Sequence, residues 1–244
     1  MTAFGLVQIV LFLVVIVALV QPLGRYMANV YEGEPTWLSR LLSPLERLVY
    51  RVAGIDPRSE QDWRQYALAL LVFNLAGLVV VYLLQRLQGL LPLNPQGFGP
   101  VAPDSAFNTA VSFATNTNWQ GYGGETTLSN LTQMLGLGAQ NFLSAASGMA
   151  VLVALTRGFV RRETTGIGNF WVDLTRGTLY ILLPLSTLLA VALVSQGVVQ
   201  SFAPHRQVSL VEPLTIQVAA TDVSGASVTD ATGRPVLRDE RITE

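Results

Sequence analysis

The sequence contains no cysteine and no lysine, and it has a single histidine. Without cysteine, these residues form no disulfide, thiolate metal site or cysteine nucleophile, and the redox compartment stays undecided. Because all 15 basic residues are arginine, the segment also contains no Walker A lysine and no Schiff-base lysine. The lone His205 is interpreted as an ordinary loop residue, and it excludes a histidine-cluster metal site or a Ser-His-Asp triad in a membrane core.

Charge is scarce as well. Only 13% of the 244 residues are charged, half are hydrophobic, and the mean hydropathy is +0.44. A soluble domain usually has roughly 25% charged residues. The formal net charge of −1 gives no basic surface for nucleic acid, so we expect no nucleic-acid partner. The composition therefore predicts a membrane protein whose main partner is the lipid bilayer.

Four apolar segments are long enough to cross about 30 Å of hydrocarbon, which takes roughly 20 residues. No arginine precedes the first segment, so it is predicted to be a retained helix rather than a signal peptide. In the third segment Gly136, Gly138 and Gly148 are interpreted as packing residues. Pro184 predicts a kink in the fourth. The predicted spans are Ala3–Val20, Tyr66–Leu84, Met134–Leu155 and Gly177–Val199.

The arginines predict the orientation of these spans. Six arginines lie in Leu23–Arg64, whereas Gln88–Thr127 contains none, and four more lie between the third and fourth spans. Because short cytoplasmic loops are enriched in basic residues, we expect the first and third loops inside and the second loop outside. The N-terminus and residues 201–244 are then extracytoplasmic.

The expected organisation has five parts. Within the linker, the apolar residues of Trp37–Val52 recur at helical spacing. This spacing fits an interfacial helix or an ordinary packed linker equally well. Pro44 is a candidate start for a second helical piece. The tail has turn signals at Ser224-Gly225 and Gly233-Arg234-Pro235, which predict a small hairpin or loop. The sequence ends at RDERITE without a closing element, so we expect a fragment. The parts are 1–24 (first transmembrane helix), 25–64 (cytoplasmic or interfacial linker), 65–160 (span, loop and span), 161–200 (cytoplasmic loop and next span) and 201–244 (extracytoplasmic segment).

The loop between the second and third spans has an unusual order of residues. Asp104 or Ser105 is a candidate helix cap, and Ala106–Ala114 is too short a helix to cross a membrane. A polar stretch, Thr115–Gln120, and several glycines then precede a full span. This order predicts a re-entrant pore loop, with a pore helix at about 104–115 and a filter at about 115–121. The alternative is an extracellular loop with a short surface helix.

The chemistry of this loop favours a cation. A half-helix directs its partly negative C-terminal end into the membrane. The carbonyls that follow, with the side-chain oxygens of Asn116, Thr117 and Asn118, can replace the water shell of an ion. The return contains no carboxylate, and neutral oxygens suit potassium. The Gly121-Tyr122-Gly123 match to potassium channels is too short to place a filter.

Four stretches carry a resemblance to a known family. These are TNTNWQ at Thr115–Gln120, GETT at Gly124–Thr127, QNFLSAASG at Gln140–Gly148 and PLG at Pro22–Gly24. They resemble the potassium-transporting subunit (A chain) of the Kdp P-type potassium pump. The resemblance implies an all-α, multi-pass protein of the bacterial inner membrane, with ten transmembrane helices and four span–pore loop–span repeats like those of potassium channels.

The resemblance also implies roles for individual residues. Asn116, Thr117 and Asn118 would form one quarter of a potassium selectivity filter, and Gln120 would support that filter. ATP would be hydrolysed by a separate catalytic subunit, with small accessory subunits in the same complex, so this chain would have no catalytic residues of its own. A passive channel subunit is the alternative function, and a non-transporting scaffold is a weaker one. A complete member is more than twice as long as this chain, so we expect the fragment alone not to transport potassium.

Overall fold

The computed structural model describes residues 3–161, 166–199, 201–204, 214–220 and 236–242. It divides into two units, Met1–Phe202 and Ala203–Glu244, which are described separately. In the described part of the first unit, four helical stretches are long and apolar enough to cross a membrane. They are Phe4–Glu32, Trp63–Leu90, Thr132–Val160 and Phe170–Ser195. The predicted all-α class with four possible spans is therefore confirmed.

Helix α1 (Ala3–Glu32) continues well beyond Val20, where its apolar run ends. Its last turns are helical because Val30 and Tyr31 are buried in a cluster with Leu179 and Ile181. Hydropathy marks the lipid-facing part of α1 but not this packed extension, and the boundary expected at residue 24 falls inside the helix.

The linker forms one helix, α2 (Ser39–Ala53). Pro44 lies inside α2, so the expectation that it begins a second helical piece is wrong. Gly54 ends the helix in the left-handed conformation that glycine adopts without a steric penalty. Tyr50 is buried, whereas Leu41, Leu48 and other apolar residues of α2 stay exposed.

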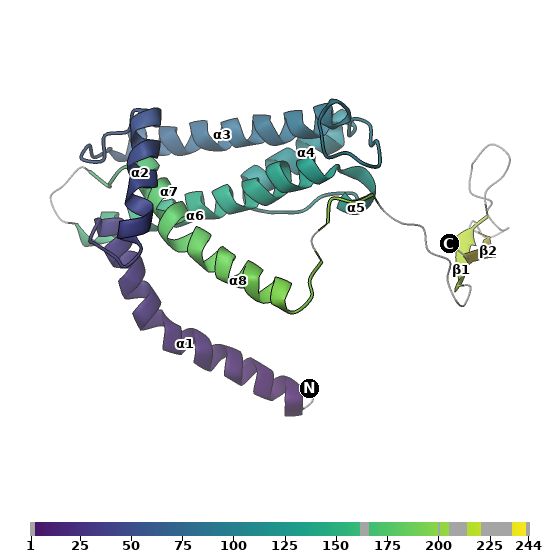
Figure 1. Cartoon of the computed structure of the whole chain (residues 1–244), viewed down its shortest axis with the longest axis horizontal. Helices are drawn as coiled ribbons and strands as arrows, with labels where there is room; N and C mark the ends of the chain where they lie inside the picture. The colour runs from purple at the N-terminus through teal and green to yellow at the C-terminus, as the bar shows by residue number, and fades with distance from the viewer. Residues whose placement is uncertain (1–2, 162–165, 200, 205–213, 221–235, 243–244) are drawn as a thin grey trace. The chain divides into compact units, whose positions relative to one another are not determined.

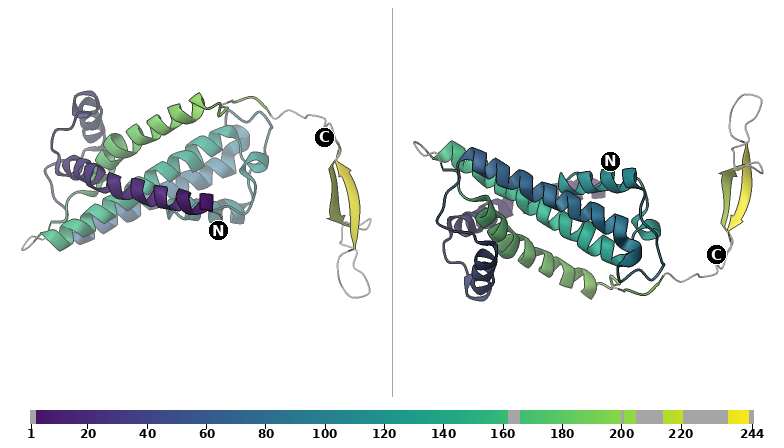
Figure 2. Two further views of the ribbon diagram at one scale, coloured as in Figure 1. Left: turned by 90° about the horizontal axis from the view of Figure 1, so that it is seen from below. Right: turned by 90° about the horizontal axis from the view of Figure 1, so that it is seen from above.

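Helix α3 (Trp63–Leu87) starts with a capping box, in which Asp62 accepts hydrogen bonds from the first-turn amides and Gln65 binds back to the amide of Asp62. A short 3-10 turn, η1 (Gln88–Leu90), follows it. The third stretch consists of a π-helical segment, η2 (Thr132–Gly138), and α6 (Ala139–Val160). Figures 1 and 2 show α3 and α6 side by side, with the short α4 (Pro103–Ala114) against them.

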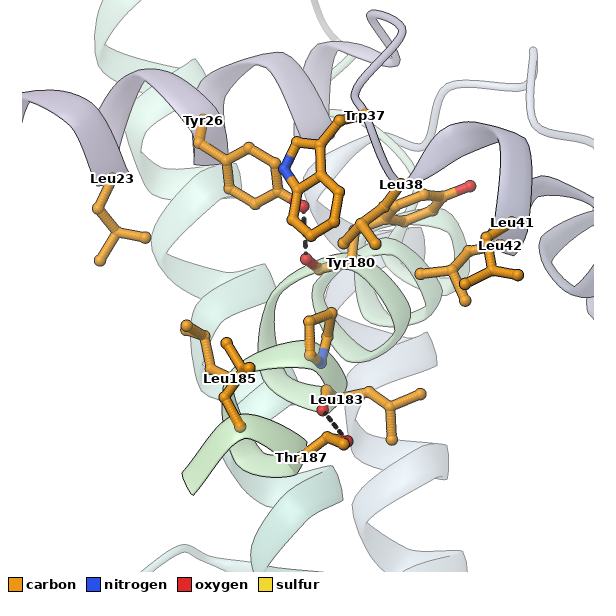
Figure 3. Close-up of a pocket in the computed structure, with 12 residues that line it drawn as sticks. Leu23, Tyr26, Trp37, Leu38, Leu41, Leu42, Tyr180, Leu183, Leu185 and Thr187 are labelled. Carbon is orange, nitrogen blue, oxygen red and sulfur yellow. Dashed lines mark hydrogen bonds between the residues drawn. The ribbon is translucent and has the colours of Figure 1, made fainter. Parts of the chain in front are cut away.

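The fourth stretch consists of α7 (Phe170–Arg176), a π-helical segment η3 (Gly177–Leu182) and α8 (Leu183–Ser195). Asn169 caps its start, which explains why the helix begins seven residues before the predicted Gly177. Pro184 cannot donate a hydrogen bond to the carbonyl of Tyr180. That carbonyl instead accepts a hydrogen bond from Tyr26 Oη at 2.7 Å (Figure 3).

The main core lies where α3, α6 and α7 meet. Phe170 makes edge-on contacts with Tyr66, Phe73 and Trp171. Ala146 and Ala150 of α6 are fully buried in the same cluster, because small side chains let the helices approach.

In the second unit, β1 (Leu214–Ala219) pairs antiparallel with β2 (Leu237–Ile242). The register sets Leu214 opposite Ile242 and Ala219 opposite Leu237. His205 and the two turn signals expected in this tail lie outside the described residues.

Candidate functional site

The candidate site begins with α4, the predicted pore helix. Pro103 occupies its first turn, where a missing amide hydrogen costs nothing, and its N-cap, Ala102, makes no side-chain capping bond. The expectation that Asp104 or Ser105 caps the helix is therefore wrong: both lie inside the first turn. Asp104 still complements the positive end of the helix dipole from there.

The position of α4 can be followed from its contacts at either end. Near its start, the carbonyl of Ala106 accepts a hydrogen bond from Gln85, close to the C-terminal end of α3. Just beyond its end, Asn116 accepts a hydrogen bond from Ser144 of α6. Ser144 lies twelve residues after Thr132, where the membrane-length stretch Thr132–Val160 begins. The segment after α4 thus lies beside a membrane-length helix, well away from the first residue of that helix.

Ser112, in the last turn of α4, organises the backbone of the segment that follows. Its carbonyl accepts the amides of Thr117 at 2.9 Å and Asn118 at 3.3 Å, and its Oγ accepts the amide of Trp119 at 2.8 Å. In a trans peptide the carbonyl points opposite to the next amide hydrogen. The carbonyls of Asn116, Thr117 and Asn118 are therefore all directed away from Ser112.

This alignment depends on an uncommon backbone. Asn116 and Asn118 both have φ of 60°, the left-handed region that asparagine tolerates better than most residues. Alternation of this conformation brings successive amides to one side of the chain and carbonyls to the other. Among the hydrogen bonds of the described residues, none is accepted by the carbonyls of residues 116–118. Three neighbouring oxygens are thus available to a ligand.

The side chains of the segment support one another. Ser144 Oγ and Asn118 Nδ2 both donate to Asn116 Oδ1, each over 3.2 Å. The hydroxyls of Thr115 and Thr117 lie 3.1 Å apart. Residues 115–119 are exposed in this chain, so the surface that carries the free oxygens is open.

Gln120 lies beyond the aligned carbonyls rather than among them. A methyl group added at Gly124 would lie 3.2 Å from its Nε2 and 3.4 Å from Oε1 of Gln133, so these two side chains flank the start of α5 (Gly124–Thr127). Gln133 in turn donates to the carbonyls of Gly124 and Leu128. Gln120 therefore lies in the return of the loop, after the aligned carbonyls and beside α5.

Two buried glutamines near the end of α3 clamp the loop. Gln88 donates to the carbonyls of Gly99 and Thr127 and accepts the amide of Ser129, so it joins both arms. Gln85 accepts a hydrogen bond from Tyr122 Oη at 2.7 Å and donates to α4. Both glutamines are 0% exposed.

Sequence reasoning missed these supports. Ser112 and Ser144 were not distinguished from other small residues, and the predicted second span ended one residue before Gln85. The sequence signal for these supports was the pair Gln85 and Gln88, three residues apart at the end of an apolar helix. Polar side chains at such a place need partners within the protein.

The interpretation of the third-span glycines is only partly correct. A methyl group added at Gly148 would meet nothing within 4 Å, and one at Gly136 would make ordinary contacts. The close approach occurs instead at Gly77 of α3, where an added methyl would lie 2.6 Å from Oε1 of the buried Gln140.

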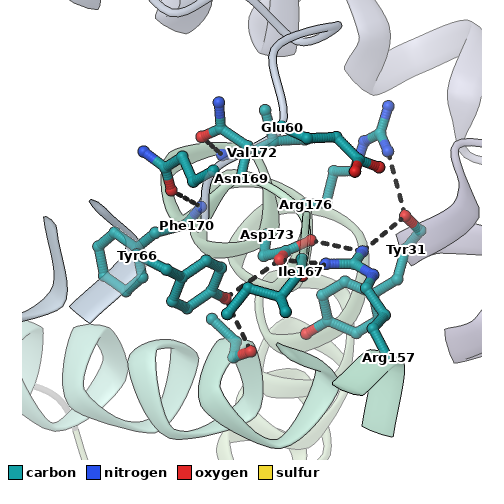
Figure 4. Close-up of polar contacts among 12 residues, drawn as sticks. Tyr31, Glu60, Tyr66, Arg157, Ile167, Asn169, Phe170, Val172, Asp173 and Arg176 are labelled. Atoms are coloured by element: carbon teal, nitrogen blue, oxygen red, sulfur yellow. Dashed lines mark hydrogen bonds and ion pairs between the residues drawn. The ribbon is translucent and has the colours of Figure 1, made fainter. Parts of the chain in front are cut away.

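A second polar cluster lies at the opposite ends of these helices (Figure 4). Arg157 of α6 binds both oxygens of the buried Asp173 at 2.6 and 2.9 Å, and Tyr66 Oη donates to Asp173 at 3.1 Å. Arg157 also donates to the carbonyls of Tyr31 and Ile167. One of the arginines used to predict the orientation thus ties α6 to α1 and α7, and Tyr66 of α3 joins the cluster through Asp173.

Glu46 connects α2 to this cluster. It accepts hydrogen bonds from Tyr180 at 2.7 Å and Tyr50 at 2.8 Å, and from Arg176 Nε at 3.1 Å. Burial by itself raises the pKa of Glu46, but these three donors outweigh it and hold that pKa below the ordinary 4.5. The linker was predicted to be either an interfacial helix or an ordinary packed linker. The face of α2 with Glu46 and Tyr50 is packed against the protein.

Comparisons with known proteins identify the family of the chain. A potassium-transporting ATPase subunit of Methylococcus capsulatus, named the potassium-binding subunit, is 62% identical over the whole chain, which covers 41% of that relative. Subunits with the same name from Sorangium cellulosum and Bordetella pertussis are 60% and 54% identical over 94% and 100% of the chain, covering 39% and 41% of the relatives. The chain therefore spans about two fifths of the length of these relatives. The family model described as the potassium-transporting ATPase A subunit matches residues 10–233, and the chain belongs to that family.

Proposed function

We propose that this chain carries the first potassium-binding pore loop of a subunit that takes up potassium as part of an ATP-driven pump. The observation that carries the proposal is the set of three consecutive carbonyls, those of Asn116, Thr117 and Asn118, directed away from Ser112. Neutral carbonyl oxygens in a row replace the water shell of a potassium ion. The C-terminal end of α4 adds a partial negative charge behind them.

In this proposal α4 is a pore helix and residues 103–127 form a re-entrant loop between α3 and the stretch from η2 to α6. The contact between Asn116 and Ser144, far along a membrane-length helix, supports that placement. Non-helical backbone at such depth is tolerated only where it lines a polar cavity or is buried in protein. Gln120 supports the outer side of the same loop.

The proposal also includes the location, the orientation and the partners of the protein. The protein lies in the bacterial inner membrane, with the N-terminus, the pore loop and residues 201–244 outside and the arginine-rich parts, 25–64 and the loop that opens 161–200, inside. Residues 65–160 form the first repeat and 161–200 begin the second. Potassium is the transported ion. A catalytic P-type ATPase subunit, with small accessory subunits, hydrolyses the ATP. The names of the relatives support a pump subunit over a passive channel.

The test uses the full-length protein, purified with its partner subunits, and measures the potassium concentration that half-saturates ATP hydrolysis. Gln120→Arg adds a positive charge beside the loop and is expected to raise that concentration by at least about tenfold, because like charges repel. Gln120→Glu is the matched control of opposite sign and is expected not to raise it. An unchanged affinity in Gln120→Arg, with the complex assembled, would contradict the placement of the ion site.

One loop supplies only part of the oxygens that a dehydrated ion needs around it. The 244-residue chain alone, reconstituted in liposomes, is therefore expected to show no potassium-selective flux. Robust potassium-selective flux from this segment would overturn the proposed division of the filter among several loops.

A further inference from the structure

A directed chain of hydrogen bonds runs behind the candidate filter. Thr109 Oγ1 of α4 donates to Tyr122 Oη over 3.2 Å, and Tyr122 Oη donates to Gln85 Oε1 over 2.7 Å. Gln85 Nε2 then donates to the carbonyls of Ala106 and Val81, each over 3.1 Å. Tyr122 and Gln85 each accept one hydrogen bond and donate onward, and hydrogen bonds linked in this way polarise one another.

The two ends of this hydrogen-bond network are buried, and Tyr122 between them is half-buried. Gln85 is 0% exposed and Thr109 is 1% exposed. The ring of Tyr122 packs against Val101, Ala106 and Leu128 in an apolar cluster. A buried polar group that loses its partner pays its full desolvation cost, so the tyrosine hydroxyl is strongly held in place.

Tyr122 anchors the segment that follows the candidate filter. Ser112 holds the backbone of residues 117–119 on one side of the candidate filter. On the other side, within the described structure, the hydroxyl of Tyr122 makes the only hydrogen bonds that join residues 120–123 to α3 or α4. The segment with the aligned carbonyls is therefore held by Ser112 on one side and by Tyr122 on the other.

We propose that Tyr122 and Gln85 are positioning residues that set the spacing of the potassium-coordinating carbonyls and thereby the ion selectivity of this loop. The inference rests on the proposed function, because it concerns the same filter segment. Releasing the Tyr122 anchor lets residues 119–123 move, and the carbonyls of Thr117 and Asn118 then adapt to ions of other sizes. Discrimination between potassium and a similar ion falls, which a general loss of stability would not cause.

The experiment compares Tyr122→Phe with Tyr82→Phe in the purified complex that contains the full-length protein. Tyr122→Phe keeps the ring and removes both hydrogen bonds. Tyr82 packs on the same apolar cluster, and no hydrogen bond of its hydroxyl occurs in the described structure, so Tyr82→Phe is a matched control. Half-saturation of ATP hydrolysis is measured for potassium and for rubidium. A second variant, Gln85→Met, removes the acceptor of the Tyr122 hydrogen bond and is expected to act in the same direction as Tyr122→Phe.

For Tyr122→Phe we expect an increase in the half-saturating potassium concentration of about tenfold, the scale of one buried hydrogen bond, and a smaller preference for potassium over rubidium. Tyr82→Phe is expected to change neither quantity. A Tyr122→Phe complex that fails to assemble, or that loses affinity for both ions equally, would assign the hydroxyl to general stability and overturn the proposal.

The Gln120→Arg variant separates this inference from the proposed function. If Gln120→Arg weakens potassium affinity and Tyr122→Phe behaves like Tyr82→Phe, the filter placement stands and only the positioning role fails. If neither variant changes potassium affinity, both the filter placement and the positioning role fail.

Discussion

The hydroxyl of Ser144, buried on α6, donates a hydrogen bond to Oδ1 of Asn116 over 3.2 Å. This bond joins a membrane-length helix to the segment with the aligned carbonyls. Asn116 Oδ1 also accepts a hydrogen bond from Nδ2 of Asn118. The orientation of Asn116 is thus fixed from two sides, by a separate helix and by its own neighbour.

Removing that hydroxyl tests the contact directly. Ser144→Ala leaves Asn116 with one partner, and we expect it to raise the half-saturating potassium concentration of the full complex several-fold, since one hydrogen bond contributes about 1 kcal/mol. Ser147→Ala is the control, because among the described residues Ser147 Oγ bonds to a carbonyl of its own helix and to no other group. Equal effects of the two variants would contradict a role for Ser144 in holding the filter.

The left-handed conformation of Asn118 leads to a second prediction. Asn118→Gly keeps this conformation accessible, whereas Asn118→Val strains it by about 1–3 kcal/mol. Both variants lose the bond to Asn116, so that loss cancels in the comparison and the strain at φ of 60° is the main remaining difference. We expect Asn118→Val to bind potassium at least about fivefold more weakly than Asn118→Gly in an assay of potassium-stimulated ATP hydrolysis. Equal affinities would show that the φ of this residue does not matter to the site.

The Arg157–Asp173 ion pair is expected to be far more important than the Arg161–Glu60 pair. Asp173 is 1% exposed, and Arg157→Met would leave its carboxylate buried without its main partner, at a cost of about 3–5 kcal/mol. The side chains of Arg161 and Glu60 are 38% and 50% exposed, so Arg161→Met is expected to cost at most about 1 kcal/mol. Thermal unfolding of the two purified variants measures the difference. Similar melting temperatures for both would refute the assignment.

Two glycines of the span helices are expected to respond differently to alanine. Gly77→Ala forces the buried Gln140 to move, because the added methyl lies 2.6 Å from its Oε1, and should destabilise the α3–α6 contact by about 1–3 kcal/mol. Gly148→Ala meets nothing within 4 Å outside its own helix backbone, among the residues that the structure describes, and should be tolerated. The fraction of assembled complex after heating compares the two. A Gly77→Ala complex as stable as wild type would argue against a tight helix contact at this point.

The stability contributed by Glu46 depends on pH. Its pKa in the folded protein lies below 4.5, so the folded state favours the carboxylate. This contribution is fully present above the ordinary pKa and is lost as the pH falls below 4.5 and through the lowered value. Glu46→Gln should therefore be less stable than wild type near neutral pH, and the gap in melting temperature should close as the medium is acidified below that value. A constant gap would show that the charge of Glu46 does not anchor α2.

Much of the architecture followed from local sequence. Long apolar runs specify membrane helices wherever they occur, because backbone groups in lipid must bond internally. The short helix at residues 103–114 and the polar stretch after it were also evident, since length and composition decide both. The extension of α1 to Glu32 was not evident, because it depends on burial of Val30 and Tyr31 against residues distant in the chain.

The same distinction holds for the candidate site. The sequence by itself determined that Asn116, Thr117 and Asn118 follow a half-helix and offer only neutral oxygens, because residue type and order suffice for that statement. Only the tertiary structure decided which way the oxygens point and what holds them there. The amides turn toward Ser112, Asn116 reaches Ser144, and Tyr122 reaches Gln85, 37 residues away in sequence. Such contacts join separate helices whose packing, rather than any local propensity, brings the partners within hydrogen-bonding distance.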